Sequence, residues 1–117
     1  MRNREREEVK GGFPEPWKPA EVGETIEGIF VGIDLVPDGR KGEFISYRIM
    51  DEESEELRSV SGAMLQTSLG RVPYGTYVWI TYVGTERLAN GLAKVYKVEM
   101  EKGVKLRNKP HSVTNDE

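Results

Sequence analysis

The side chains of this sequence that could do chemistry are aromatic rings and cations placed on neighbouring extended segments. Phe44 and Arg48 fall on one side of an alternating run, and Arg58 falls in the next run. Aromatic faces stack on nucleic-acid bases, and cations beside them neutralise phosphates. Further cations stand in the flanking loops. The candidate set for binding a single strand is Phe44, Arg48, Arg58, Arg40, Lys41, Arg87 and Lys94.

The groups that enzymes need are scarce in this chain. The single histidine, His111, falls in the polar C-terminal tail, where no predicted element would position it as a base. The acidic run at residues 51–56 lacks the glycine and the spaced ligands of a dedicated cation loop, so we interpret it as a solvated hairpin tip. The chain has no cysteine and no phosphate-binding glycine motif. We therefore expect a protein that is not an enzyme and that uses no cofactor and no metal.

Each candidate binding residue also has a purely structural interpretation. Phe44 would enter the core if the strand register slipped by one residue. Arg48 and Arg58 would pair with acids on adjacent strands, and Arg40 and Lys41 would suit any exposed turn. Trp79 has the opposite parity to the apolar positions of its own run, and we expect it to pack beneath a short helix because large aromatics seldom stay exposed.

Composition favours one small domain and an oligonucleotide site of limited charge. The chain has 117 residues and a net charge of −3, which counts against a strongly basic nucleic-acid binder. The acids crowd into residues 51–56, away from the candidate cations. No apolar run approaches the roughly 18–20 residues that a membrane helix needs, so we expect no membrane association and a cytoplasmic location.

The pattern of the chain predicts the elements that would carry these side chains. Alternation and β-branched residues predict strands at residues 25–36, 44–50, 57–62, 76–83 and 93–100, and near-helical spacing predicts a short helix at 63–72. Gly28 and Gly32 lie inside the first strand, where glycine usually marks a bend or bulge. The parity of the strands places Ile45, Tyr47, Ile49, Val78 and Ile80 in the core.

The order β-β-β-α-β-β predicts an all-β fold with one short helix, namely a five-stranded OB-fold barrel with flexible polar termini. Residues 1–20 are expected to be a flexible arm in which Trp17 closes one end of the barrel. The OB domain would occupy residues 21–106, and residues 107–117 would form a polar tail. OB barrels bind single strands on the face of their second and third strands, which is where Phe44, Arg48 and Arg58 are predicted to lie.

The chain resembles the OB-fold single-stranded DNA-binding proteins of bacteriophages. The resemblance rests on VGETIEGIFVGI, EFISYRI, SGAMLQTSLGRVPYGTYVWITYVGT and AKVYKVEMEKGVKL, which span about residues 22–106. It implies sequence-tolerant binding of single-stranded DNA during viral replication or recombination, in the host cytoplasm. Many such proteins recruit partners through an acidic C-terminal tip, and here Asn115-Asp116-Glu117 is a thin version without a terminal aromatic residue.

A second hypothesis belongs to a different class of protein. An OB-like structural or assembly module of a virion would bind protein instead of nucleic acid, through the N-terminal arm or the C-terminal tail. Such a module would form a partner complex or a homo-oligomer and would be indifferent to oligonucleotides. The sequence leaves both hypotheses open.

Overall fold

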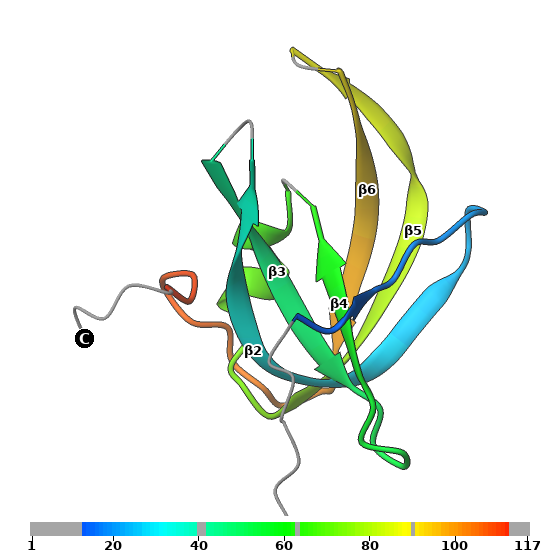
Figure 1. Ribbon diagram of the computed structural model, residues 1–117. Coiled ribbons are helices and arrows are strands. Elements are labelled where there is room, and N and C mark those ends of the chain that lie inside the picture. Colours follow the sequence, from blue (N-terminus) through cyan, green and yellow to red (C-terminus); the bar gives the residue numbers. More distant parts are fainter. Residues whose placement is uncertain (1–12, 40–41, 63, 90, 113–117) are drawn as a thin grey trace, which may run out of the picture.

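The computed structural model describes residues 13–39, 42–62, 64–89 and 91–112, and most of them form one curled sheet (Figure 1). The sheet has six strands in the order β1-β4-β3-β2-β5-β6. This confirms the all-β prediction, although the strand count differs because β1 lies in the segment predicted to be a flexible arm. The strands are β1 (Glu15–Pro16), β2 (Thr25–Asp38), β3 (Gly42–Met50), β4 (Leu57–Ser61), β5 (Thr76–Leu88) and β6 (Gly91–Met100).

Strand β2 curves so that it pairs with two different neighbours. Its first part is antiparallel to β5 as far as Phe30, and its second part is antiparallel to β3 from Ile29 onward. A Cβ atom at Gly28 would collide with the carbonyl oxygen of Met50 and would lie 2.9 Å from Cγ2 of Ile49. The register also shifts between Phe30 and Gly32, as at a β-bulge. The bend predicted from the two glycines is therefore present.

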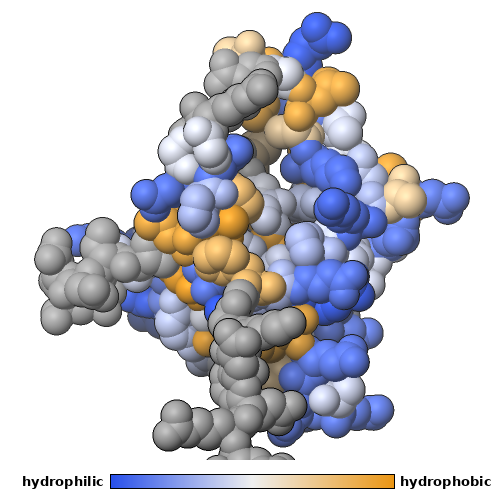
Figure 2. Space-filling model, in the orientation of Figure 1, coloured by the Kyte–Doolittle hydropathy of each residue, from blue (hydrophilic) through white to orange (hydrophobic). Residues whose placement is uncertain are grey.

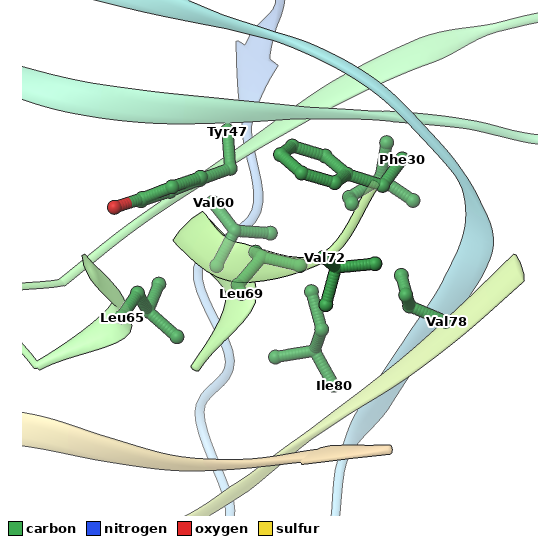
Figure 3. Close-up of a cluster of buried hydrophobic side chains, with 9 residues drawn as sticks. Phe30, Tyr47, Val60, Leu65, Leu69, Val72, Val78 and Ile80 are labelled. Atoms are coloured by element: carbon green, nitrogen blue, oxygen red, sulfur yellow. The ribbon is translucent and has the colours of Figure 1, made fainter. Parts of the chain in front are cut away.

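The buried core lies inside the curl of the sheet, and four of the five side chains predicted for it are there. Tyr47, Ile49, Val78 and Ile80 are at most 2% exposed, whereas Ile45 is only half-buried and packs at the margin. Figure 3 shows the residues that complete the cluster, which come from β2, β4 and the segment between β4 and β5. The full cluster is Phe30, Tyr47, Ile49, Val60, Leu65, Leu69, Val72, Val78 and Ile80.

The segment predicted as one helix at residues 63–72 forms two tight turns instead. These are the 3₁₀ helices η1 (Leu65–Thr67) and η2 (Leu69–Arg71). Ser68 has non-helical dihedrals between them, with φ −110° and ψ −84°, and its N–H bonds to the carbonyl of Leu65. Hydrogen bonds between residues i and i+3 close a tighter turn than those of an α-helix. Buried residues therefore do not recur at the spacing that an α-helix would give them. The turns still cover the core as predicted, because Leu65 and Leu69 are buried.

The N-terminal segment is packed on the sheet from residue 14 onward, well before the predicted domain boundary at residue 20. Strand β1 runs parallel to β4, and the backbone N–H of Trp17 donates to the carbonyl oxygen of Ser59 at 2.8 Å. The Trp17 ring lies 5.7 Å from that of Tyr96 on β6 and packs against the core. Trp17 thus lies between β4 and β6, at the open side of the curled sheet. That it closes an end of a barrel stays a prediction.

The C-terminal segment returns to η2, so the prediction of His111 as an unpacked tail residue is wrong. Its backbone N–H donates to the carbonyl of Gly70 at 2.8 Å, and its ring is only 8% exposed. The ring stacks on Tyr74 with centroids 3.7 Å apart. Its Nε2 lies 2.7 Å from the carbonyl oxygen of Val72, so an N–H at Nε2 donates there, while Nδ1 faces Arg107. These contacts between distant segments override the polar character of the local sequence.

Replacing His111 with alanine should destabilise the fold. The variant loses the stacking on Tyr74 and leaves the Val72 carbonyl without its donor, which together should cost about 1–3 kcal/mol of the free energy of unfolding. Urea denaturation measures this loss, with the exposed Lys109→Ala as control. An unfolding midpoint equal to that of the parent would contradict the packed tail.

Two tyrosines should ionise late and link stability to alkaline pH. Burial raises the pKa of Tyr47 to about 12, and the hydrogen bond from the Tyr77 hydroxyl to Glu27, at 2.7 Å, raises the pKa of Tyr77 to about 12. Because the folded values lie above the ordinary value of about 10, this stabilisation is complete below pH 10 and is lost as pH rises toward 12.

The ultraviolet absorbance of tyrosinate follows both ionisations. We expect Tyr47→Phe and Tyr77→Phe each to remove one late transition from the titration curve. Simultaneous ionisation of all five tyrosines near pH 10 would contradict the raised pKa values of Tyr47 and Tyr77.

Candidate nucleic-acid interface

A groove lies between the outer face of β3 and β4 on one side and β6 on the other. Its volume is about 330 Å³, and aromatic and lysine side chains line it from three parts of the chain. In Figure 2, hydrophobic side chains appear as orange patches on this mostly hydrophilic face. A second hollow of about 180 Å³ continues on the far side of Phe44, toward Gln66. The groove residues that matter below are Trp17, Lys18, Phe44, Ser59, Lys94 and Tyr96.

Strand alternation explains why Phe44 reaches this groove. Tyr47 and Ile49 point into the core, so Phe44 and Arg48 point outward from β3. Phe44 is 40% exposed and pairs across the ladder with Val36. The structure therefore excludes the alternative in which a register slip of one residue buries Phe44.

Arg48 is held by a carboxylate on the neighbouring strand. Its Nε lies 2.6 Å from Oδ2 of Asp34 and its Nη2 lies 2.9 Å from Oδ1, a bidentate arrangement. The hydrogen bond to Asp34 raises the pKa of Arg48, and both side chains are largely shielded from solvent. A guanidinium that is already paired offers less charge to a phosphate. Arg48 thus takes the structural role that the sequence left open.

Arg58 lies on the other face of the sheet from Phe44. It pairs with Ile49, which points into the core, so its parity is opposite to that of Arg48. The expectation that Phe44, Arg48 and Arg58 share one exposed face is therefore not met. Arg58 instead lines a separate hollow of about 120 Å³ with the carboxylates of Glu27, Asp51 and Glu56.

The acidic run is a hydrogen-bonded turn at this separate end of the sheet. Oδ1 of Asp51 accepts the backbone N–H groups of Glu53 and Ser54, each at 2.9 Å. These bonds favour the ionised carboxylate and lower its pKa. The turn therefore keeps its negative charge at the hairpin tip, where the sequence placed it.

Among the predicted cations that the structure describes, Lys94 lines the same groove as Phe44. Its Nζ lies 3.4 Å from the carbonyl oxygen of Pro19 and 5.7 Å from the centre of the Tyr82 ring. In the β5–β6 ladder, Thr85 pairs with Lys94 and Arg87 pairs with Leu92. Arg87 therefore shares a face with Lys94, two residues farther toward the hairpin end. Arg40 and Lys41 lie outside the described residues.

Three groove residues were missed as binding candidates at the level of sequence. Trp17 and Lys18 come from the N-terminal segment, where their proximity to Phe44 depends on how the chain enters the fold. Tyr96 lies on the same face of β6 as Val98, and both pack against the margin of the core. The only local signal was an aromatic residue and a lysine between prolines, in the sequence PWKP.

Trp79 does not pack beneath the short helical turns as predicted. It pairs with Glu27 on one side and Glu99 on the other, with parity opposite to that of the core residue Ile80. Its ring is half-buried on the outer face of β5, in an edge contact with Tyr77 at 5.0 Å. The partner that limits its exposure is thus a neighbouring tyrosine.

Among the described residues, no group of three or more histidine and acidic side chains could hold a metal ion. No helix there is long and apolar enough to cross a membrane. Comparisons with protein-family models, curated proteins and solved structures found no match to this chain. The groove and its lining residues are therefore the features of the described chain that bear on function.

The pairing of Arg48 with Asp34 should be measurable as a coupling energy. A double-mutant cycle of Arg48→Ala and Asp34→Ala, followed by urea unfolding, should give about 0.2–1 kcal/mol for this cross-strand pair. A parallel cycle of Arg58→Ala with Asp34→Ala should give none, since Arg58 lies on the opposite face. Additive effects of Arg48→Ala and Asp34→Ala would contradict the assignment of Arg48 as a structural cation.

Proposed function

We propose that this protein is a non-catalytic, sequence-tolerant single-stranded DNA-binding protein. The single observation that carries the proposal is that Phe44 lies exposed in the same groove as Tyr96 and Lys94. Exposed rings offer stacking surfaces that accept every base, and a lysine beside them offers a charge for the phosphate backbone. The groove of about 330 Å³ is open to solvent and not enclosed, which suits a bound single strand.

We further propose that the sheet is an OB-type barrel with one added strand. Without β1, the order is β4-β3-β2-β5-β6, with a bent first strand at the centre and a helical segment between the third and fourth strands. Both features are expected for a small barrel of this kind. In Figure 1 the β2–β3 and β5–β6 hairpins both project toward the top, as loops that border a binding face would. Together with the resemblance to bacteriophage proteins, this supports a role in viral DNA replication or recombination.

Because few unpaired cations are placed to contact phosphates, we expect base stacking to contribute more to the affinity than phosphate contacts do. Arg48 is paired and Arg58 faces away, so Lys18, Lys94 and Arg87 remain for phosphates among the described candidates. Each phosphate contact on a single strand contributes about −0.7 to the slope of log K against log salt concentration. Two or three contacts therefore predict a shallow slope of about −1.4 to −2.1.

Fluorescence anisotropy with a labelled dT oligonucleotide tests this function. Phe44→Ala should weaken binding by about 1–3 kcal/mol because one stacking surface is lost. Lys94→Ala should reduce the salt slope by about 0.7 with a smaller loss of affinity. Arg58→Ala is the matched control, and its affinity should equal that of the parent protein.

Two results would contradict the proposed function. One is the absence of detectable binding at about 50 mM salt, where electrostatic contacts are strongest. The other is an affinity that does not change in Phe44→Ala. The first result would favour the structural or assembly module that binds protein, and the second would reassign Phe44 to the scaffold.

A further inference from the structure

The N-terminal segment, residues 14–19, supplies one wall of the groove. We propose that a bound single strand is clasped between this segment and the sheet, with Trp17 stacking on a base and Ser59 holding Trp17 in position. This inference rests on the proposed function, and it adds a binding element that the strands of the sheet do not contain.

Ser59 is the main anchor of the segment. The Trp17 N–H donates to the Ser59 carbonyl at 2.8 Å, and the Ser59 hydroxyl donates to the carbonyl of Pro14 at 3.3 Å. Ser59 is only 4% exposed, so both bonds are shielded from water. Because the segment contains prolines at positions 14, 16 and 19, it has few N–H groups with which to pair. The bond from Trp17 is therefore a large share of its attachment.

Trp17 is placed so that its ring serves both the fold and the groove. One part of the ring packs on Tyr96, with centroids 5.7 Å apart and planes inclined by 41°. The ring is half-buried, and its remaining surface lines the groove beside Lys18. Phe44 lines the same groove from β3. Aromatic surfaces thus approach the groove from two separate parts of the chain.

Lys94 links the two walls of the groove. Its Nζ is 3.4 Å from the carbonyl of Pro19, so it contacts the segment while it lines the groove from β6. A strand that touches Trp17, Lys94 and Phe44 contacts the segment and the sheet at once. Such a ligand binds only the docked arrangement, and by linkage the docking of the segment and the binding of the strand strengthen one another.

The chain offers a direct optical test, because Trp17 and Trp79 are its two tryptophans. The variant Trp79→Phe leaves Trp17 as the reporter in the groove. The variant Trp17→Phe leaves Trp79, on the outer face of β5, as the matched control. During titration with a dT oligonucleotide, the emission of Trp17 should be quenched in step with the anisotropy signal, and that of Trp79 should stay constant.

Affinity measurements complete the test. Trp17→Ala should bind about 5- to 150-fold more weakly, the loss expected for one stacked base. Ser59→Ala removes the hydroxyl bond to the Pro14 carbonyl but keeps the backbone carbonyl that accepts the Trp17 N–H, so it should weaken binding less than Trp17→Ala does. Arg58→Ala, on the other face of the sheet, should change neither the affinity nor the quenching of Trp17. Thermal unfolding of each variant identifies any loss that comes from unfolding, and Trp17→Phe, which keeps an aromatic ring, should retain most of the affinity.

The outcomes separate this inference from the proposed function. Binding that leaves Trp17 emission unchanged and that persists in Trp17→Ala would overturn the clasp and leave the single-strand function standing. Absence of any anisotropy change with the parent protein would overturn both.

Discussion

The close approach of the backbone at Gly28 is the constraint on which the rest of the structure depends. The carbonyl oxygen of Met50 occupies the space that a side chain would need, so only glycine lets β2 pass from β5 to β3 without a break. One strand can then pair with both halves of the sheet, and the sheet curls around a single core. The curl also separates the β2–β3 hairpin from the β5–β6 hairpin, and the groove lies between the strands that these hairpins extend.

The gap that the curl leaves between β4 and β6 is filled by side chains from the N-terminal segment. Trp17 packs on Tyr96, and Lys94 reaches the carbonyl of Pro19. Side chains can fill such a gap incompletely, whereas a continuous ladder of backbone hydrogen bonds would seal it. The packing between the two sides of the curled sheet and the aromatic lining of the groove are therefore consequences of the same contacts. The C-terminal segment acts at another place, where His111 packs on Tyr74 and Phe30.

Local patterns were sufficient to predict five of the six described strands and most of the core. A period of two residues assigns Tyr47 and Ile49 to the inside and Phe44 to the outside, because neighbouring side chains of a strand must point to opposite faces. The same rule gave no clear answer for residues 57–62, where neither face is plainly apolar. The register with β3 decides that case and turns Arg58 away from the groove.

Contacts between distant segments could not be predicted in the same way. The partner of Arg48 is Asp34, which lies 14 residues away and diagonally across a ladder whose register includes a bulge. His111 is buried because residues 107–111 return to η2, and no local pattern gives that path. The packing of Trp17 was predicted, but its contacts with Ser59 and Tyr96 depend on the path of residues 14–19. The helix predicted at residues 63–72 was the right length to cover the core, but its geometry follows the turn at Ser68.

We propose that single-stranded DNA occupies the groove between residues 17–18, Phe44 and β6. The decisive experiment is NMR mapping of backbone amide chemical shifts during titration with a dT oligonucleotide. The largest changes should fall at Trp17, Lys18, Phe44, Lys94 and Tyr96, with the acidic turn at 51–56 and Arg58 unperturbed. Changes concentrated on the outer face at Tyr77 and Trp79, or no changes at all, would contradict it.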